Sequence, residues 1–147
     1  MDILNYLQVN DGLATSGQPR AEQFAEIANL EYRTVINLAL PTSDDAIAHE
    51  GELVTAQDMN YIHIPVIWEK PELSQYQLFC VVMEAHKPFK VWVHCAKNMR
   101  VSCFVALYGM KYLGFSDKEA ASLISKIWQP NEVWSQFMSL AQSKNSH

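Results

Sequence analysis

Short apolar runs alternate along the chain with longer segments whose apolar residues recur every three or four positions. The short runs are rich in β-branched residues and favour buried strands, whereas the longer segments have helical spacing. The expected strands are residues 34–38, 61–66 and 91–93, with a further short apolar segment at 13–16. The expected helices are residues 20–30, 45–59, 72–86, about 100–113, one beginning after Ser116 and one from about 130 to 142. This alternation predicts an α/β fold: a single domain over residues 1–147, whose central, mostly parallel sheet of about four to five strands is flanked by helices.

The composition leaves the predicted fold unchanged but limits the classes of molecule that the protein is expected to bind. A chain of 147 residues can bury a core without a metal or disulfide, and its net charge of -5 argues against a nucleic-acid partner. No stretch approaches the roughly 18 uncharged apolar residues of a membrane span, and the first residues lack a basic leader, so neither a membrane partner nor a signal peptide is expected. Three cysteines without a C-x-x-C spacing favour a reducing compartment, and hence the cytoplasm.

The residues that carry chemistry fall in one predicted strand-loop-helix unit. A buried strand runs into His94 and Cys95, and an apolar helix begins near Arg100. The loop between them consists of Ala96, Lys97, Asn98 and Met99. The N–H groups of such a loop and of the helix start form an anion site, whose field can lower a cysteine pKa from about 8.5 to between about 3.5 and 7.5. We therefore predict a reactive thiolate at Cys95, and core positions for Cys80 and Cys103 on apolar helical faces.

Three neighbouring residues fit the same chemistry. Arg100 offers a planar fork that can grip two phosphate oxygens, and Ser102 can hydrogen-bond the sulfur. His94 can orient the loop through its ring nitrogens. A cysteine at a strand end is often only a small buried hydrophobe, but the coincidence of all four residue types in one unit favours the functional interpretation of Cys95.

The other histidines are interpreted as structural. His63 falls in an expected strand and His86 at the end of an expected helix. His49 and Glu50 fall within the helix expected at 45–59, and we assign them to its solvated face.

The unit at Cys95 resembles the signature of the protein-tyrosine-phosphatase superfamily, especially its small dual-specificity-like bacterial members. That signature is His-Cys, five residues, then Arg and Ser or Thr. Residues 16–19, 34–38, 62–66 and 114–131 are also similar to segments of these proteins, so the likeness covers roughly residues 13–137.

The resemblance implies a role for each residue that matches the signature. Cys95 would be the nucleophile, Arg100 would grip the phosphoryl group, and the hydroxyl of Ser102 would help the thiolate leave. It also implies that the protein needs no metal or other cofactor, and that its partner is a phosphorylated small molecule or a phosphoprotein.

The loop departs from the signature in length. Four residues separate Cys95 from Arg100 instead of five. Either Arg100 is the arginine of a shortened loop, or Val101 takes that position and Arg100 points elsewhere. Asn98 stands where many members have Gly, and Asn tolerates a left-handed backbone, so a tight turn there is compatible with the sequence.

The general acid is the second departure. After residues 64–66 the family usually offers an Asp two positions on, where this chain has Trp68. Glu69 is the nearest carboxyl and can protonate a leaving oxygen if the loop brings it within reach. The alternative is an ordinary surface Glu beside Lys70.

Three functions remain open on the sequence. The first is phosphomonoester hydrolysis through a cysteinyl-phosphate on Cys95. The second is sulfur transfer, because six residues from Cys to Arg is the loop length of rhodanese-like enzymes, which carry a persulfide. The third is a phosphatase-like module that binds anions or a protein partner without turnover. Assays with an aryl phosphate and with thiosulfate plus cyanide distinguish them.

Overall fold

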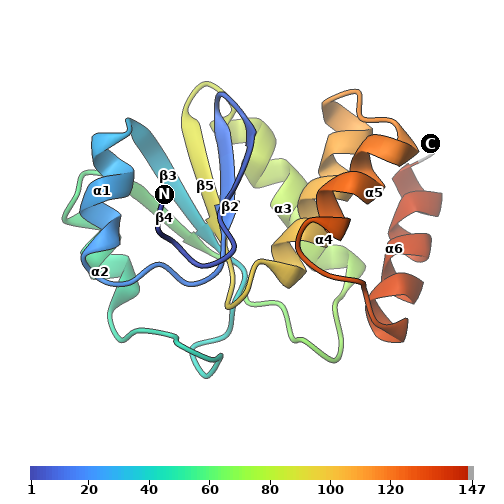
Figure 1. Cartoon of the computed structure of the whole chain (residues 1–147), viewed down its shortest axis with the longest axis horizontal. Coiled ribbons are helices and arrows are strands. Elements are labelled where there is room, and N and C mark those ends of the chain that lie inside the picture. Colours follow the sequence, from blue (N-terminus) through green and yellow to red (C-terminus); the bar gives the residue numbers. More distant parts are fainter. Residues whose placement is uncertain (146–147) are drawn as a thin grey trace.

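A five-stranded sheet forms the centre of the computed structural model, which describes residues 1–145 (Figure 1). The strand order is β1-β2-β5-β3-β4. The strands are β1 (Leu7–Asn10), β2 (Leu13–Ser16), β3 (Tyr32–Asn37), β4 (Asn60–His63) and β5 (Lys90–His94). The β1–β2 pair is antiparallel and the other pairs are parallel. The expected α/β class with a mostly parallel sheet is confirmed.

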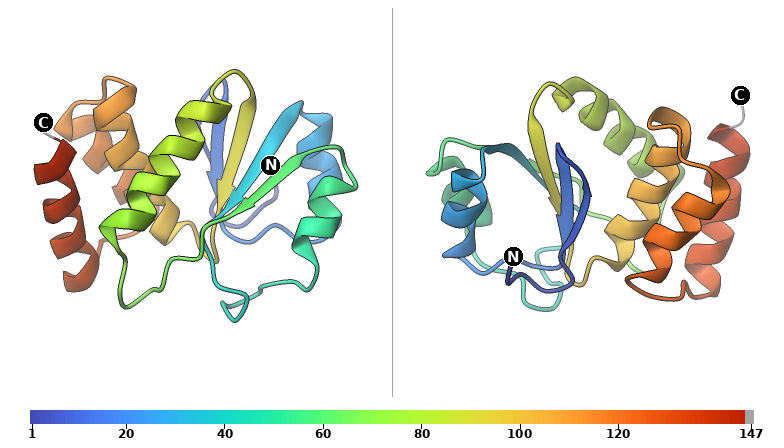
Figure 2. Two further views of the ribbon diagram at one scale, coloured as in Figure 1. Left: turned by 180° about the vertical axis from the view of Figure 1, so that it is seen from behind. Right: turned by 45° about the horizontal axis from the view of Figure 1, so that its top comes forward.

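Helices cover both faces of the sheet. They are α1 (Gln23–Asn29), α2 (Glu50–Thr55), α3 (Leu73–His86), α4 (Met99–Tyr112), α5 (Asp117–Ser125) and α6 (Glu132–Asn145). The first two lie on one face, and α3 and α4 on the other with α5 and α6 outside them (Figures 1 and 2). Among the described residues, no helix is both long and apolar enough to cross a membrane.

The core lies in two layers, one on each face of the sheet. Along β5, Val91 and Val93 belong to the cluster beneath α3 and α4, while Trp92 belongs to the cluster beneath α1. Successive side chains of a strand point to opposite faces, so a central strand is apolar at every position. This explains the uninterrupted apolar run at 91–93.

Two expected elements differ in the structure. The helix expected at 45–59 is reduced to α2, and residues 38–49 form an irregular loop in which Asp45 and His49 have positive φ angles of 62° and 60°. A left-handed residue cannot continue a right-handed helix. The strand β1 was not expected, although its alternation of half-buried and exposed side chains and the turn at Gly12 are typical of a hairpin.

The loops after the parallel strands meet at one edge of the sheet. Parallel strands place their carboxyl ends together, and ligands of open α/β sheets bind there. The segments 38–49, 64–72 and 95–98 all lie at this edge, at the bottom of Figure 1. The fold therefore brings the predicted Cys95 unit beside two other loops.

Candidate active site

The loop at residues 95–98, called here the Cys95 loop, turns sharply from β5 into α4. Asn98 caps α4 with φ 67°, in the left-handed region. Its side-chain amide donates to the Asn5 carbonyl at 2.9 Å and to Thr15 Oγ1 at 3.0 Å. The compatibility of Asn98 with a tight turn is thus confirmed, and its side chain ties the short loop to the segments around β1 and β2.

A second contact supports the Cys95 loop from the chain that follows β2. The Gln18 N–H donates to the Ala96 carbonyl at 2.9 Å. A Cβ on Gly17 would lie 2.7 Å from that carbonyl oxygen, so only glycine allows this approach. Residues 16–19 were similar to a family segment in sequence, and in the structure Gly17 and Gln18 support the Cys95 loop.

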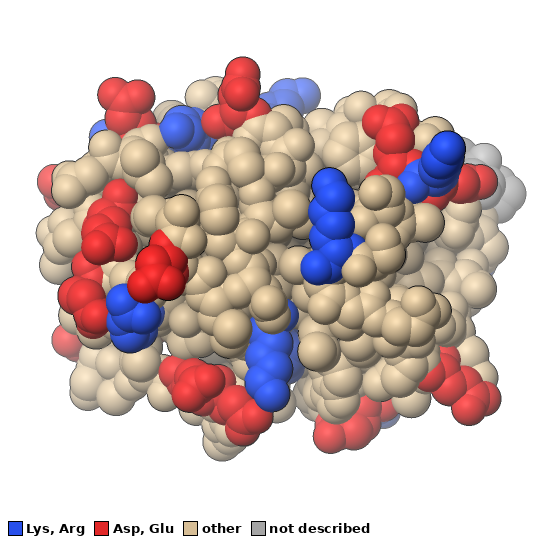
Figure 3. Space-filling model, viewed as in Figure 1, with Lys and Arg blue, Asp and Glu red and all other residues tan. Residues whose placement is uncertain are grey.

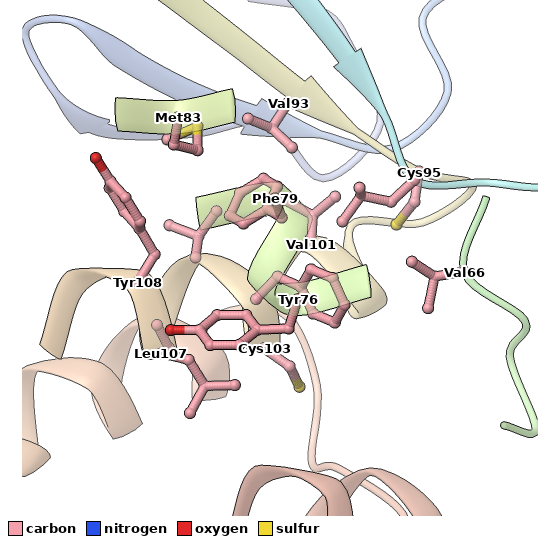
Figure 4. Close-up of a cluster of buried hydrophobic side chains, with 14 of the residues drawn as sticks. Val66, Tyr76, Phe79, Met83, Val93, Cys95, Val101, Cys103, Leu107 and Tyr108 are labelled. Atoms are coloured by element: carbon pink, nitrogen blue, oxygen red, sulfur yellow. The ribbon is translucent and has the colours of Figure 1, made fainter. Parts of the chain in front are cut away.

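A pocket of about 450 Å³ opens at the carboxyl edge of the sheet. It is lined by six residues named from the sequence, which are Glu69, Cys95, Ala96, Lys97, Met99 and Arg100. Figure 4 shows Cys95 at the margin of the buried apolar cluster, with its sulfur directed towards Val66. Cys95 itself is 1% exposed. The structure therefore gathers most of the predicted site around one cavity.

Arg100 forms part of the pocket wall. Its guanidinium donates to the Val66 carbonyl at 2.8 Å and to Ser43 Oγ at 3.3 Å, and it lies 5.9 Å from the Trp68 ring centroid. Val101 is fully buried in the core. Of the two alignments left open by the sequence, the structure shows the one in which Arg100 faces the pocket.

Ser102 does not lie in the pocket. Its hydroxyl donates to the Met99 carbonyl at 2.6 Å and accepts from the Trp128 indole N–H at 3.0 Å. Two residues along a helix turn the side chain by about 200°, so Ser102 faces away when Arg100 faces the pocket. The hydrogen bond to the sulfur that the sequence suggested is not formed.

Two carboxyl groups border the pocket, from different loops. Glu69 follows β4 and is exposed. Asp44, in the loop after β3, lies 3.9 Å from the Lys97 ammonium. Figure 3 shows a basic side chain among acidic ones at this lower edge. Of these two carboxyl groups, only Glu69 was expected from the sequence.

His94 and Glu50 form a buried pair behind the Cys95 loop. His94 Nε2 lies 2.7 Å from Glu50 Oε2, and the side chains are 0% and 6% exposed. Burial raises the pKa of Glu50, but hydrogen bonds from His94, Gln18 and Tyr61 outweigh it and leave the pKa lowered. The assignment of Glu50 to a solvated helix face was wrong, since α2 begins at Glu50 and directs this carboxylate inward.

The other expected structural residues have local partners. His63 lies 2.6 Å from the Ala39 carbonyl, and His86 lies 2.9 Å from Thr34 Oγ1. Cys80 and Cys103 are buried, as expected for core positions. Burial raises the pKa of both thiols, to about 12 for Cys103.

Solved structures show what this arrangement is similar to. A phosphatase candidate of the DUF442 family from Shewanella putrefaciens CN-32 has 32% sequence identity and a TM-score of 0.90, over 99% of this chain and 93% of that one. A second structure of the same description has 31% sequence identity and a TM-score of 0.91, over 99% of this chain and 96% of that one. Tk-PTP in its active form has 16% sequence identity and a TM-score of 0.80, over 95% of this chain and 97% of that one. TpbA of P. aeruginosa in complex with pTyr has 16% sequence identity and a TM-score of 0.69, over 95% of this chain and 91% of that one.

The strand order and these likenesses define a protein-tyrosine-phosphatase-like α/β domain. Within that class, the chain belongs to the DUF442 family of phosphatase-like proteins. No profile of a known protein family matches the sequence. No curated protein sequence matches it significantly either.

Proposed function

We propose that this protein is a cysteine-dependent phosphomonoesterase. One observation carries the proposal: Cys95, the guanidinium of Arg100 and a carboxyl group border the same pocket at the start of a helix. Such a helix start favours anions, because its first N–H groups have no partner within the helix. A dianionic phosphate therefore suits this pocket.

The reaction proceeds in two displacements. The Cys95 thiolate attacks phosphorus, so that an S–P bond forms while the bond to the ester oxygen breaks. Glu69 gives its proton to the departing oxygen. Water then attacks phosphorus, gives a proton to the Glu69 carboxylate, and displaces the thiolate to release phosphate. No metal or other cofactor takes part in these steps.

Arg100 and the loop amides stabilise the charge of the transferred phosphoryl group. A guanidinium carries five N–H donors, and its bonds to Val66 and Ser43 leave three for phosphate oxygens. Both bonds hold the guanidinium in place before substrate arrives. Preorganised donors of this kind supply much of the rate enhancement in enzymes.

The substrate is a phosphorylated small molecule or a phosphoprotein. The pTyr bound to TpbA, which shares the fold, supports a phosphorylated substrate. Besides Arg100, the pocket border carries one lysine and two carboxyl groups, so its charge suits a single phosphate better than a polyphosphorylated ligand.

The deciding experiment compares the wild type with Cys95→Ser and Cys103→Ser in p-nitrophenyl phosphate hydrolysis. Cys95→Ser should abolish turnover, whereas Cys103→Ser removes a buried thiol outside the pocket and should retain it. Mass spectrometry of acid-quenched wild type should find the phosphoryl group on the Cys95 peptide.

The same preparations are assayed with thiosulfate and cyanide, and titrated with inorganic phosphate. Sulfur transfer without phosphate hydrolysis would replace our proposal with a Cys95 persulfide enzyme. Phosphate binding without either activity would make the protein an anion-binding module.

A further inference from the structure

The buried His94–Glu50 pair joins the Cys95 loop to α2, a helix that does not line the pocket. Forty-four positions separate the two residues in the sequence. The carboxylate also accepts from Gln18 Nε2 at 2.6 Å, and the Gln18 backbone N–H binds the Ala96 carbonyl at 2.9 Å. Glu50 is therefore connected to the Cys95 loop along two routes.

Both ring nitrogens of His94 face oxygen atoms, and both of these oxygens accept hydrogen bonds when Glu50 is ionised. Nε2 faces Glu50 Oε2 at 2.7 Å, and Nδ1 faces the Cys95 carbonyl at 3.2 Å. A neutral imidazole has one N–H, which would leave the other nitrogen lone pair against an oxygen lone pair. The partners of His94 thus match an imidazolium, which donates from both nitrogens.

The surroundings of Glu50 favour its charged form. Gln18, His94 and the Tyr61 hydroxyl all donate to the carboxylate, and Tyr61 is itself held by Asn37 Nδ2 at 3.0 Å. Three donors offset the cost of burying the charge. The ring of Phe24, from α1, packs against His94 with a centroid separation of 6.4 Å.

We infer that Glu50 is a positioning residue, which holds His94 as a buried imidazolium against the backbone of Cys95. The two ring nitrogens point in opposite directions, so the carboxylate lies beyond the imidazole as seen from Cys95. The pair is neutral in total, but its positive member adjoins Cys95. A four-residue loop offers one amide fewer than a five-residue loop, and the imidazolium adds a field of the same sign.

The first test measures the charge state of His94 directly. In the intact wild-type protein, ¹⁵N-edited NMR of the histidine side chains should show both nitrogens of His94 protonated at about pH 7, where a free imidazole is mostly neutral. Assignment rests on the signal lost in His94→Asn. A wild-type spectrum with one protonated nitrogen would overturn the inference, whatever any variant does.

The second test replaces the carboxylate by its neutral isostere. Glu50→Gln should lose the doubly protonated signal and slow iodoacetamide alkylation of Cys95 by about fivefold or more at about pH 6, with the rates converging near pH 9, where thiolate forms without help. Glu52→Gln is the matched control, because Glu52 lies on the same helix with a side chain 82% exposed. Equal alkylation rates in a folded Glu50→Gln and the wild type would contradict the inference.

Any effect of Glu50 on catalysis rests on the proposed phosphatase function, but the His94 NMR signal and the Cys95 alkylation rate do not. Glu50→Asp keeps the charge and should recover the NMR signal and part of the alkylation rate, which a merely structural carboxylate would not explain. If Glu50→Gln fails to fold, the wild-type spectrum and Glu50→Asp decide. A doubly protonated His94 in a protein without phosphatase activity would support the inference and refute the phosphatase proposal.

Discussion

Arg100 is the residue on which phosphate affinity should depend most. Arg100 is 6% exposed, and its guanidinium is already fixed by hydrogen bonds to Val66 and Ser43. Charge-assisted hydrogen bonds contribute about 1.5–3 kcal/mol net, so Arg100→Ala should weaken inorganic phosphate binding about tenfold to a hundredfold. Isothermal titration calorimetry of both proteins measures the change.

Arg100→Lys should recover little of this affinity, because an ammonium cannot reproduce the planar fork. Arg33→Ala is the control, since Arg33 is exposed on β3 away from the pocket. Unchanged binding in Arg100→Ala would mean that the phosphate site lies elsewhere.

Glu69 and Asp44 compete for the role of general acid. We expect Glu69→Gln to lower kcat for phenyl phosphate about a hundredfold, and to change p-nitrophenyl phosphate hydrolysis much less, because nitrophenolate leaves without a proton. Asp44→Asn should change both rates less than about threefold, since its carboxylate lies beside Lys97 at 3.9 Å. The opposite pattern would assign the acid to Asp44.

At the scale of elements, the close contact between the end of β2 and the Cys95 loop should be sensitive to a single methyl group. Gly17→Ala places a Cβ 2.7 Å from the Ala96 carbonyl oxygen and must displace backbone. Overpacking of this kind costs about 1–3 kcal/mol, and the displaced loop should also lower kcat. Urea unfolding and aryl phosphate turnover measure the two effects.

Gly12→Ala provides the comparison within the same hairpin. A Cβ there would meet Asn10 Oδ1 at 3.8 Å, an ordinary contact. Its free energy of unfolding should stay within about 0.5 kcal/mol of the wild type. If both variants behave alike, the contact between Gly17 and Ala96 does not hold the loop.

For the whole molecule, the buried pair should couple stability to pH. The pKa of Glu50 is lowered from 4.5, so the folded protein binds this proton less readily than the unfolded chain. Its stabilisation is therefore complete above about pH 4.5 and is lost as the pH falls through the lower folded value. The difference in unfolding free energy between wild type and Glu50→Gln should shrink on acidification below about pH 4.5.

Denaturant unfolding across this range, with Glu52→Gln in parallel, measures the effect. The side chain of Glu52 is largely solvated, so its variant should follow the wild type at every pH. A difference between wild type and Glu50→Gln that stays constant with pH would contradict the coupling.

The sequence by itself determined the layers of this molecule and the unit at its centre. The apolar run at 91–93, the length of the helix that follows and the tolerance of Asn98 for a left-handed backbone are local properties. Periodicity and turn chemistry act over a few residues, so they can be read without the fold. The same local signals failed at 45–49, where a helix was expected but Asp45 and His49 adopt left-handed conformations. The spacing of apolar residues does not indicate such conformations.

Only the tertiary structure decided which distant residues surround Cys95. The strand β5 comes last along the chain but lies between β2 and β3, so the loops after all three meet. That order brings Gly17 beneath Ala96, Ser43 to Arg100 and Glu50 to His94. Such contacts arise from the pairing of strands far apart in sequence, and hydrophobic periodicity contains no information about that pairing.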